Sequence, residues 1–407
     1  MTNRKRQDGS SQILGIFPSE IRGGAEEYVL TVLAEVVRAG FRVAVAFPPR
    51  AATAGLVDEF RTAGVAYYPL EIAETGDRRA ENRRHLKRLL LTLQLLLRVR
   101  PDAVQLTLGT PEFGLGSILA CALAHVPTMV VFQLVPGVAG FGKRKLRLYR
   151  WARLSRQVWV AVSEDNRRLL CDSFGAGRGE VVRIYNGAAA AAFPPSEENA
   201  TVASARAKVR EELGLPLDSR VLLTVGRLHP QKGYVDLVRI ARYIVDAFPG
   251  VCFVWVGDGE QRQELEQLAK GAGLLESIRL LGFRRDLTRL MSAADLFLFP
   301  SRYEGFPLAL LQAMAIGLPI IASDCSSIPE IISDRIHGVL FPAGEVLALY
   351  HSVCWALNHP NEMQTMAARA KVRVKEFSPE RMIAESLTVL RELGGGKTDR
   401  AARRPQT

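Results

Sequence analysis

The stretch RVLLTVGRLHPQKGYVDLVRIARYIVDAFPGVCFVWVG, residues 220–257, decides the fold. It divides into an apolar strand over 220–226, a loop over 227–233, a helix over 234–248 that Pro249 and Gly250 close, and an apolar strand over 251–257. Strand, loop, helix and strand in this order form a βαβ unit. Such units build parallel sheets with helices on both faces, so this half of the chain is predicted to be α/β.

The N-terminal half begins with the same order of elements. A strand over 13–17, a glycine-containing loop over 18–24, a helix that Gly40 ends and a strand over 41–47 follow one another. The chain has 407 residues, 48% of them hydrophobic, which is enough for two cores of ordinary size. We therefore predict two Rossmann-like domains facing each other across a cleft, and this cleft is the candidate ligand site.

The composition of the chain suggests where the domains begin and end. The alanines, prolines and polar residues of NGAAAAAFPPSEENATVASA mark a boundary between the two halves, and both ends of the chain are polar. The expected organisation is a disordered tail over 1–11, an N-terminal domain over 12–190, a linker over 191–207, a C-terminal domain over 208–378, a helix over 379–394 that can cross back to the N-terminal domain, and a disordered tail over 395–407.

The compartment is indicated by the cysteines and by the N-terminus. The five cysteines are scattered and form no CxxC pair, so neither a disulfide framework nor a zinc site is expected. The polar start MTNRKRQDGSSQ shows no secretory signal. The longest stretch without Asp, Glu, Lys or Arg, residues 113–142, contains several glycines and prolines and is expected to form a helix and a strand rather than a membrane span. A reducing, cytoplasmic location is predicted.

The net charge of +11 predicts an anionic partner, which can be nucleic acid, an acidic membrane surface or a phosphorylated ligand. Residues 143–156 interleave seven Lys and Arg residues with leucines, Tyr149 and Trp151, a pattern that suits a helix lying in the headgroup layer of a membrane and equally suits a solvated basic face. A second basic run over 83–100 has many leucines, which we expect to lie in the core. No DNA or RNA module is recognisable, so nucleic acid is not expected as a partner.

A dinucleotide-binding enzyme is the first hypothesis for this architecture, but its fingerprint is missing. The first loop has Gly23 and Gly24 without G-x-G-x-x-G, and the next strand ends in FPPR with no acidic residue for a ribose. What remains are basic and glycine-containing loops after the strands. Arg227 and Lys232 stand at the two ends of one such loop, where both cations can converge on a diphosphate.

An ordered set of motifs resembles a known family. GRLHPQKG, VGDGE, LGF, PSRYEGFPLALLQAMAIGLPIIAS and IPEII, preceded by GGAEE, SEDN and IYNG, are similar in order and spacing to the retaining GT-B glycosyltransferases of family GT4, the group 1 glycosyl transferases. The resemblance covers nearly the whole chain. It implies a GT-B fold and transfer of a sugar from a nucleoside diphosphate sugar to an acceptor, with retention at the anomeric carbon and without a catalytic metal.

The resemblance also implies roles for individual residues. Arg227 and Lys232 would stabilise the charge that grows on the diphosphate, and Glu304 would hold hydroxyls of the donor sugar; these three are the expected catalytic residues. Pro307 is expected at the first position of a helix that Gly317 ends. The expected donor-binding residues are Gly23, Gly24, Gly226, Gly305, Phe306, Pro307, Leu308, Gln312 and Arg284. No metal ligand is expected.

Three positions depart from the family pattern. Gln312 stands where the family's E-x7-E motif has a second glutamate, and an amide offers a ribose one acceptor where a carboxylate offers two. Gln133 stands where many relatives have a histidine near the acceptor, and glutamine cannot act as a base. Alanines follow Asn186 and Gly187, where relatives often have an acid, and from these two residues we expect only a turn. Weaker site candidates are Ser163, His229 and Glu330.

Two functions follow from these residues. The first is a glycosyltransferase using a UDP- or GDP-linked sugar, acting in cell-envelope polysaccharide or glycolipid synthesis on a lipid-linked or polysaccharide acceptor. It would be cytoplasmic and peripheral at the inner face of the membrane, with residues 143–156 on the lipid. The alternative is a sugar-nucleotide-binding protein, or a partner-dependent subunit, without transfer activity of its own.

Overall fold

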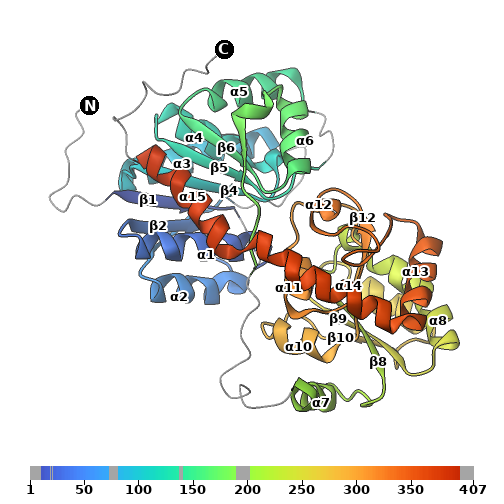
Figure 1. Ribbon diagram of the computed structural model, residues 1–407. Coiled ribbons are helices and arrows are strands. Elements are labelled where there is room, and N and C mark those ends of the chain that lie inside the picture. Colours follow the sequence, from blue (N-terminus) through green and yellow to red (C-terminus); the bar gives the residue numbers. More distant parts are fainter. Residues whose placement is uncertain are drawn as a thin grey trace. The chain divides into compact units, whose positions relative to one another are not determined.

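The computed structural model of the protein describes residues 11–18, 20, 22–72, 81–136, 141–188 and 202–394. The chain separates into two compact units. Unit 1 comprises residues 1–186 together with 379–407, and unit 2 comprises residues 187–378. Figure 1 shows the helices and strands of both units.

Unit 1 contains a seven-stranded parallel sheet with the strand order β3-β2-β1-β4-β5-β6-β7. Its strands are β1 (Gln12–Ile16), β2 (Arg42–Phe47), β3 (Ala66–Pro69), β4 (Ala103–Leu108), β5 (Thr128–Phe132), β6 (Gln157–Ala161) and β7 (Val181–Arg183). Its helices are α1 (Gly24–Arg38), α2 (Ala54–Thr62), α3 (Glu81–Val99), α4 (Pro111–Leu123), α5 (Lys143–Arg153), α6 (Glu164–Phe174) and α15 (Pro379–Gly394).

Unit 2 contains a six-stranded parallel sheet with the strand order β10-β9-β8-β11-β12-β13. Its strands are β8 (Arg220–Val225), β9 (Val251–Val256), β10 (Ile278–Leu280), β11 (Leu296–Phe299), β12 (Ile320–Asp324) and β13 (Val339–Pro342). Its helices are α7 (Val202–Glu212), α8 (Tyr234–Ala247), α9 (Arg262–Gly271), α10 (Leu287–Ala293), α11 (Leu308–Ile316), α12 (Ile328–Ile331), α13 (Val346–Asn358) and α14 (Pro360–Arg373).

The two sheets confirm the prediction of two Rossmann-like domains. In each unit the strand order reverses beside the first strand, because β1 lies between β2 and β4 and β8 lies between β9 and β11. All five residues of β5 and all six of β9 are buried, as expected for parallel strands covered on both faces. The carboxyl ends of the strands at such a reversal point are where open α/β sheets bind ligands.

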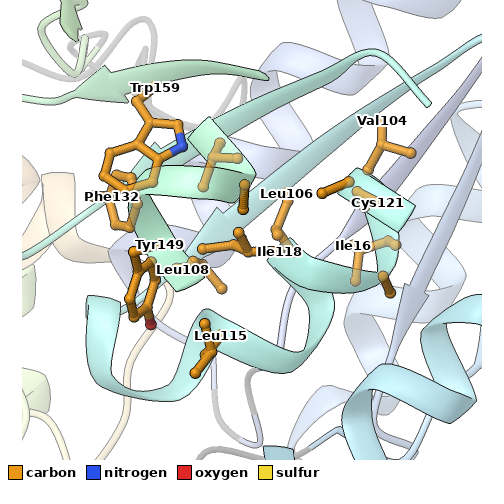
Figure 2. Packing of buried hydrophobic residues seen from close by; sticks show 14 of the residues in the cluster. Ile16, Val104, Leu106, Leu108, Leu115, Ile118, Cys121, Phe132, Tyr149 and Trp159 are labelled. Carbon is orange, nitrogen blue, oxygen red and sulfur yellow. The ribbon is translucent and has the colours of Figure 1, made fainter. Parts of the chain in front are cut away.

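One hydrophobic core of unit 1 lies between its sheet and the layer formed by α3, α4, α5 and α6. Tyr149, Phe132 and Trp159 pack edge to face there, with ring centroids 5.1 Å apart for Phe132 and Trp159 (Figure 2). Helix α4 is almost entirely buried, and α3 crosses it so closely that a Cβ at Gly116 would lie 2.3 Å from the carbonyl oxygen of His85. Small residues on α4 therefore allow the two helices to pack backbone against backbone.

Helix α15 packs on unit 1, against α1 and beside β4 and β5. Tyr28 of α1 and Ser386 of α15 share a buried hydrogen bond of 3.4 Å between their hydroxyl oxygens. Burial raises the pKa of the Tyr28 phenol to about 12. Helix α15 thus covers the buried face of α1 and completes this side of unit 1.

The boundaries of the units differ in detail from those expected. Unit 1 ends at Asn186 rather than at residue 190, because the side chain of Asn186 is held within unit 1 by Gln133. Helix α7 begins at Val202, inside the segment expected to be a linker. The expected tails over 1–11 and 395–407 and the linker up to residue 201 lie almost wholly outside the described residues.

Two features bear on the earlier expectations about membranes and cysteines. Within the described ranges, no helix combines the length and the apolar character needed to cross a bilayer. The uncharged stretch that begins at Phe113 contains most of α4 and all of β5, as its pattern predicts. All five cysteines are free thiols.

Unit 2 contains a buried arginine that fastens α7 to the sheet. The guanidinium of Arg210 is 2 % exposed and donates to the carbonyls of Ala293, Leu217 and Ser219 and, at 2.7 Å, to the carboxylate of Asp295. Burial lowers the pKa of Arg210 from its ordinary value, and the charge of Asp295 opposes that effect. Asp295 is therefore the counter-ion of a buried cation.

We expect Asp295→Ala to lower the free energy of unfolding of unit 2 by about 3–5 kcal/mol, because Arg210 would be left buried without its counter-ion. The control is Asp246→Ala, which removes an exposed pair with Arg242 on α8 and should cost less than about 1 kcal/mol. Urea denaturation followed by tryptophan fluorescence measures both. Equal losses in the two variants would contradict the assignment.

Candidate functional site

A lysine and a glutamate from two different loops meet beside the central strands of unit 2. The Nζ atom of Lys232 donates to Oε1 of Glu304 at 2.5 Å, and their side chains are 18% and 6% exposed. Lys232 follows β8 and Glu304 follows β11, which are neighbouring strands. The structure thus brings together two of the three residues expected to be catalytic.

Two glycines, at positions where a larger residue would not fit, allow the loop after β8 to pack closely against its neighbours. Gly233 adopts φ +71°, and a Cβ there would lie 2.1 Å from the carbonyl oxygen of Pro300 at the end of β11. Gly257, after β9, adopts φ +137°, and a Cβ there would lie 2.0 Å from the carbonyl oxygen of Gly226. These approaches draw the loop against its neighbours on both sides, and only glycine permits them.

Several contacts fix the position of the Lys232 ammonium group. The residue ends a short 3-10 helix, Pro230–Lys232, and its methylene groups pass close to Gly226. Its Nζ lies 5.2 Å from the centre of the Phe299 ring. The phenol of Tyr234, fully buried at the start of α8, donates to the carbonyl of Gly226 at 2.9 Å. Lys232 is therefore a held cation rather than a freely moving surface lysine.

The two loops are also joined through their backbones. The backbone N–H of Arg302 donates to the carbonyl of Gln231 at 2.7 Å. The side-chain Nε2 of Gln231 donates to the carbonyl of Tyr303 at 2.8 Å. Arg302 in turn pairs at 2.5 Å with Asp236, a buried carboxylate on α8. Together these bonds set the separation of the residues that carry Lys232 and Glu304.

Helix α11 starts just after Glu304. Pro307 is the residue before its first turn, with φ −76° and ψ 114°, so it lies one position earlier than predicted. Gly317 ends the helix in the left-handed conformation, as predicted. Gly305 is buried beside Glu304, and Leu308 opens the helix. The first backbone N–H groups of a helix have no partner within the helix, and no side chain caps this one. An anion would be stabilised there.

Two predicted donor-binding side chains on this segment have different surroundings. The ring of Phe306 is buried against Phe377, with centroids 5.3 Å apart, so only its backbone remains to contact a ligand. Gln312 lies half-buried one to two turns into α11. Ser323 in β12 and Cys325 just after it both donate to the carbonyl of Ser301, which ties β12 to the segment that leads into Glu304.

Arg227, the third expected catalytic residue, is exposed at the start of the same loop. It forms no ion pair with any of the described residues.

His229 lies between Arg227 and Lys232 in the sequence of this loop. Its Nδ1 accepts a bond of 3.1 Å from the N–H of Gln231 and so caps the short helix that carries Lys232. Its Nε2 lies 3.4 Å from Oε1 of Glu260. Burial, and then the charge of Arg227, lower the pKa of His229.

Arg284 does not offer a free cation. Its guanidinium makes a two-bond pair with Asp286, at 2.8 and 2.6 Å, and a third bond with Glu212 of α7. Arg289 completes the same cluster. The prediction that Arg284 binds the donor rested on a motif position alone, and its strongest contacts are instead with carboxylates of unit 2.

In unit 1, the predicted glycines lie at the carboxyl edge of the sheet. Gly23 is the residue before α1 and Gly24 opens the helix, and both are exposed. The neighbouring Arg22 is paired with Glu27 and Glu59. The N-terminus of α1 thus follows the end of β1, and binding of donor phosphates by its backbone N–H groups stays a prediction.

Gln133 follows β5 and belongs to a cluster of side-chain amides. Its Oε1 accepts a bond of 3.0 Å from Nδ2 of Asn186, and its backbone carbonyl accepts one of 3.4 Å from Asn166. Its Nε2 is buried and has no hydrogen-bond partner among the described residues. The cluster fixes the glutamine and leaves a donor group for a ligand oxygen. The contact from Asn186 was missed, because the motif IYNG was interpreted only as a turn.

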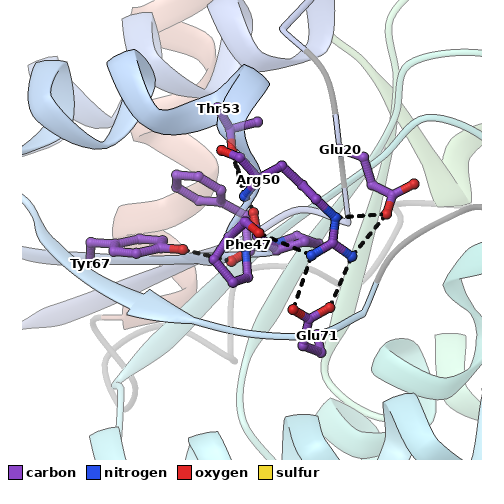
Figure 3. Close-up of polar contacts among 8 residues, drawn as sticks. Glu20, Phe47, Arg50, Thr53, Tyr67 and Glu71 are labelled. Atoms are coloured by element: carbon purple, nitrogen blue, oxygen red, sulfur yellow. Dashed lines mark hydrogen bonds and ion pairs between the residues drawn. The ribbon is translucent and has the colours of Figure 1, made fainter.

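The end of β2 carries an arginine where dinucleotide-binding proteins have an acid. Arg50 makes two bonds of 3.0 Å to Glu71, and its Nε donates to Glu20 at 3.0 Å (Figure 3). The hydroxyl oxygen of Thr53 accepts a bond from the backbone N–H of Arg50. Because carboxylates already surround the guanidinium, the cluster ties the loops after β1, β2 and β3 to one another.

The weaker candidates have structural partners. Ser163 caps α6 by accepting a bond of 3.0 Å from the N–H of Asn166. The backbone carbonyl of Glu330 accepts a bond from Arg373. Across the part of the chain that the structure describes, no cluster of three His, Cys, Asp or Glu side chains is arranged to hold a metal ion.

Two family models match the chain over nearly equal lengths. The model for Glycosyltransferase Family 4 matches residues 22–191, and the model for Glycosyl transferases group 1 matches residues 205–373. The first range covers most of unit 1, and the second contains the loops with Lys232 and Glu304.

Curated relatives match parts of the chain. It is 28% identical over 272 residues to the Escherichia coli UDP-Gal:alpha-D-GlcNAc-diphosphoundecaprenol alpha-1,3-galactosyltransferase, covering 64% of this chain and 67% of that protein. It is 33% identical over 195 residues to the amylovoran biosynthesis glycosyltransferase AmsK of Erwinia amylovora, covering 44% and 46%. The matches therefore span from about half to two thirds of these relatives.

Solved structures share the fold over almost the whole chain. Anabaena HepE in complex with UDP-glucose superposes with a TM-score of 0.77 at 22% identity, covering 94% of this chain and 99% of that one. WaaG, a glycosyltransferase involved in lipopolysaccharide biosynthesis, gives a TM-score of 0.73 at 15% identity, covering 93% and 99%. Fold and site thus define a glycosyltransferase of the GT-B class. The chain belongs to the family 4, group 1 glycosyltransferases.

The pKa of His229 generates a prediction about stability. Since the folded protein resists protonating His229, the unfolded state binds more protons once the pH falls below the ordinary histidine pKa of about 6.5. The contribution of neutral His229 is therefore present at pH 7 and is lost as the pH falls through that window. Urea unfolding at pH 7.5 and at about pH 5.5 should show His229→Gln losing less stability on acidification than the wild type does. His351→Gln, at an exposed position on α13, is the control, and an identical pH response in the His229 variant would contradict the prediction.

Proposed function

We propose that the protein transfers a sugar from a nucleoside diphosphate sugar to an acceptor hydroxyl with retention of the anomeric configuration. The observation that carries this proposal is the contact between Lys232 and Glu304 just before the start of α11, with Arg227 at the other end of the loop that holds Lys232. A held ammonium group, a second cation and the N-terminus of a helix suit a diphosphate, and a carboxylate beside them suits sugar hydroxyls.

The proposed reaction requires stabilisation of the negative charge on the leaving diphosphate rather than a strong base. As the bond between the anomeric carbon and the phosphate oxygen breaks, negative charge grows on the diphosphate, and Lys232 and Arg227 stabilise it more strongly in the transition state. The acceptor oxygen bonds to the anomeric carbon, and its proton passes to an oxygen of the leaving phosphate. Gln133 cannot take that proton, but its Nε2 can donate to an acceptor oxygen. We propose that these two cations do the work that a metal ion does elsewhere, so that no metal is required.

A UDP-linked sugar is the proposed donor. The Anabaena neighbours were solved with UDP and with UDP-glucose, and the Escherichia coli relative is described as using UDP-Gal. GDP-linked sugars are the second choice. A lipid-linked or polysaccharide acceptor is proposed, because the Escherichia coli relative is described as acting on a diphosphoundecaprenol-linked sugar and AmsK as acting in amylovoran biosynthesis. The proposed location is the cytoplasmic face of a membrane, in cell-envelope polysaccharide or glycolipid synthesis.

A second function has one observation in its favour. Gln312 and Gln133 replace residues that family members use at the donor and acceptor sides, which suits a protein that binds sugar nucleotides without transferring the sugar, or a subunit that needs a partner. The enzyme is preferred because Lys232, Glu304 and Arg227 are all present and two of them are in contact.

A thermal-shift panel of UDP, GDP, ADP and their sugars tests the donor site, because a ligand that binds only the folded state raises the unfolding midpoint. We expect UDP to stabilise the wild type and Lys232→Met to weaken UDP binding about 10- to 100-fold, through loss of a charge-assisted contact. Glu304→Gln should leave UDP affinity nearly unchanged but abolish release of UDP from UDP-sugar in the presence of acceptor. Arg242→Met, at an exposed pair on α8, is the matched control.

The outcomes of the panel separate the two functions. Nucleotide binding without UDP release, with any acceptor or in a cell lysate, would favour the binding protein. Absence of binding by every nucleotide would overturn both functions.

Gln312→Glu provides an independent prediction. A carboxylate at this position can accept from both ribose hydroxyls, so UDP affinity should rise about fivefold, equivalent to roughly 1 kcal/mol. Gln267→Glu introduces the same change at an exposed position of α9 and should have no effect. Isothermal titration with UDP measures both variants. Unchanged affinity in Gln312→Glu would remove the residue from the proposed ribose contact.

A further inference from the structure

Helices α3, α4 and α5 form one layer on a single face of the unit 1 sheet. Residues of all three helices contribute to the same hydrophobic cluster, and α4 contacts α3 on one side and α5 on the other. Helix α4 is buried along nearly its whole length. On this side of the unit, the outward faces of α3 and α5 are therefore exposed where α4 is covered.

Helix α3 differs from what its sequence predicted. Leu95 and Leu96 are buried, as expected for core residues. Three other leucines, spaced four and seven residues apart on one stripe of the helix, are turned to the outside, with exposed fractions of 59% for Leu86, 50% for Leu90 and 72% for Leu97. Exposed leucines in such a row are unusual on a helix that already has a buried face.

Helix α5 and the residue after it carry a matching row. Leu148 is 42% exposed, Trp151 44% and Leu154 76%, at intervals of three residues that place them on one side of the helix. The opposite side holds Tyr149 and Ala152, which are fully buried in the core. A half-exposed tryptophan beside leucines is typical of a helix lying at a membrane interface.

The segments that form α3 and α5 are rich in cations and poor in acids, although Arg88 is buried and donates to the carbonyl of Phe113. Six Lys and Arg residues lie over 83–100 and seven over 143–156, whereas the whole span 83–156 contains two acids, Asp102 and Glu112. Lys143, Arg144 and Arg147 are exposed. They form no hydrogen bond or ion pair with any of the described residues.

Other basic residues of α5 are turned back into unit 1. Arg153 pairs with Glu180 at 2.8 Å, and Arg150 donates to the carbonyl of Phe174. Among the described residues, the cations of α5 that have no such contact include Arg144 and Arg147 near its start. Helical periodicity places these two on the same side as Leu148 and Trp151.

We propose that the outward faces of α3 and α5 together dock on an anionic lipid surface, with the six exposed apolar residues in the headgroup layer and the cations on lipid phosphates. Charge decides the occupant, since a second copy of this chain would present the same positive charges and be repelled, whereas anionic lipid neutralises them. This surface rests on the proposed function in one respect, since it would bring the protein to the membrane that holds a lipid-linked acceptor. Lipid binding itself requires no transfer activity.

Flotation with phosphatidylcholine vesicles, prepared with and without phosphatidylglycerol, tests the surface. The full-length protein should float with the anionic vesicles only, and high salt should release it. Leu86→Ser with Leu97→Ser, and separately Leu148→Ser with Trp151→Ala, should each weaken binding about tenfold or more, because each pair removes apolar area from the lipid contact. Arg144→Glu with Arg147→Glu should abolish binding.

Matched controls lie on unit 2. Leu347→Ser changes a leucine of α13 that is also 72% exposed, and Arg369→Glu with Lys371→Glu reverses two exposed charges on α14. These variants should bind vesicles as the wild type does. Equal losses in the controls, losses confined to the α5 variants, or equal binding to uncharged vesicles would each overturn the two-helix surface.

Two further measurements make the result interpretable. Unchanged thermal midpoints show that the variants are folded, and light scattering reports self-association. A doubled mass that the leucine variants abolish, without vesicle binding, would make this face a dimer interface and overturn the proposal. Vesicle binding without nucleotide binding would keep the surface and remove the proposed transferase function, whereas nucleotide binding without vesicle binding would do the reverse.

Discussion

The contact between Lys232 and Glu304 depends on how closely two loops approach each other. Neither side chain could hold its position if the loop after β8 stood away from the end of β11, and Gly233 allows the approach because it has no Cβ to strike Pro300. Gly257 does the same on the side of β9. A buried carboxylate is costly unless a cation or hydrogen-bond donors compensate it. The glycines therefore set the electrostatics of the site, although none of them carries a charge.

The parts of the fold that could be predicted are those governed by local pattern. The βαβ order over 220–257, the buried runs of the central strands and the left-handed end of α11 at Gly317 all follow from apolar periodicity and from glycine. The motif set led to the family that the comparisons establish. These signals lie within short windows of sequence, where backbone preferences decide.

The features that could not be predicted depend on partners distant in the sequence. Arg284 occupies a motif position, yet its guanidinium is bonded to Asp286 and Glu212. The sequence around residue 284 does not predict the contact with Glu212. The contact of Asn186 with Gln133 spans 53 residues. Some leucines of α3 are buried and others are exposed, because α4 and the sheet pack against only one side of this helix. Which face is covered is a property of the assembled layer.

The packing of α15 on unit 1 sets an order for events in the cell. Residues 379–394 leave the ribosome after all of unit 2 has been made, so the face of α1 that carries Tyr28 stays uncovered throughout that time. Unit 2 is continuous in sequence and can complete its own sheet first. The domain that is synthesised first is thus the last to be finished. A nascent chain that is interrupted before residue 379 would release a first domain with part of its core exposed to solvent and to chaperones.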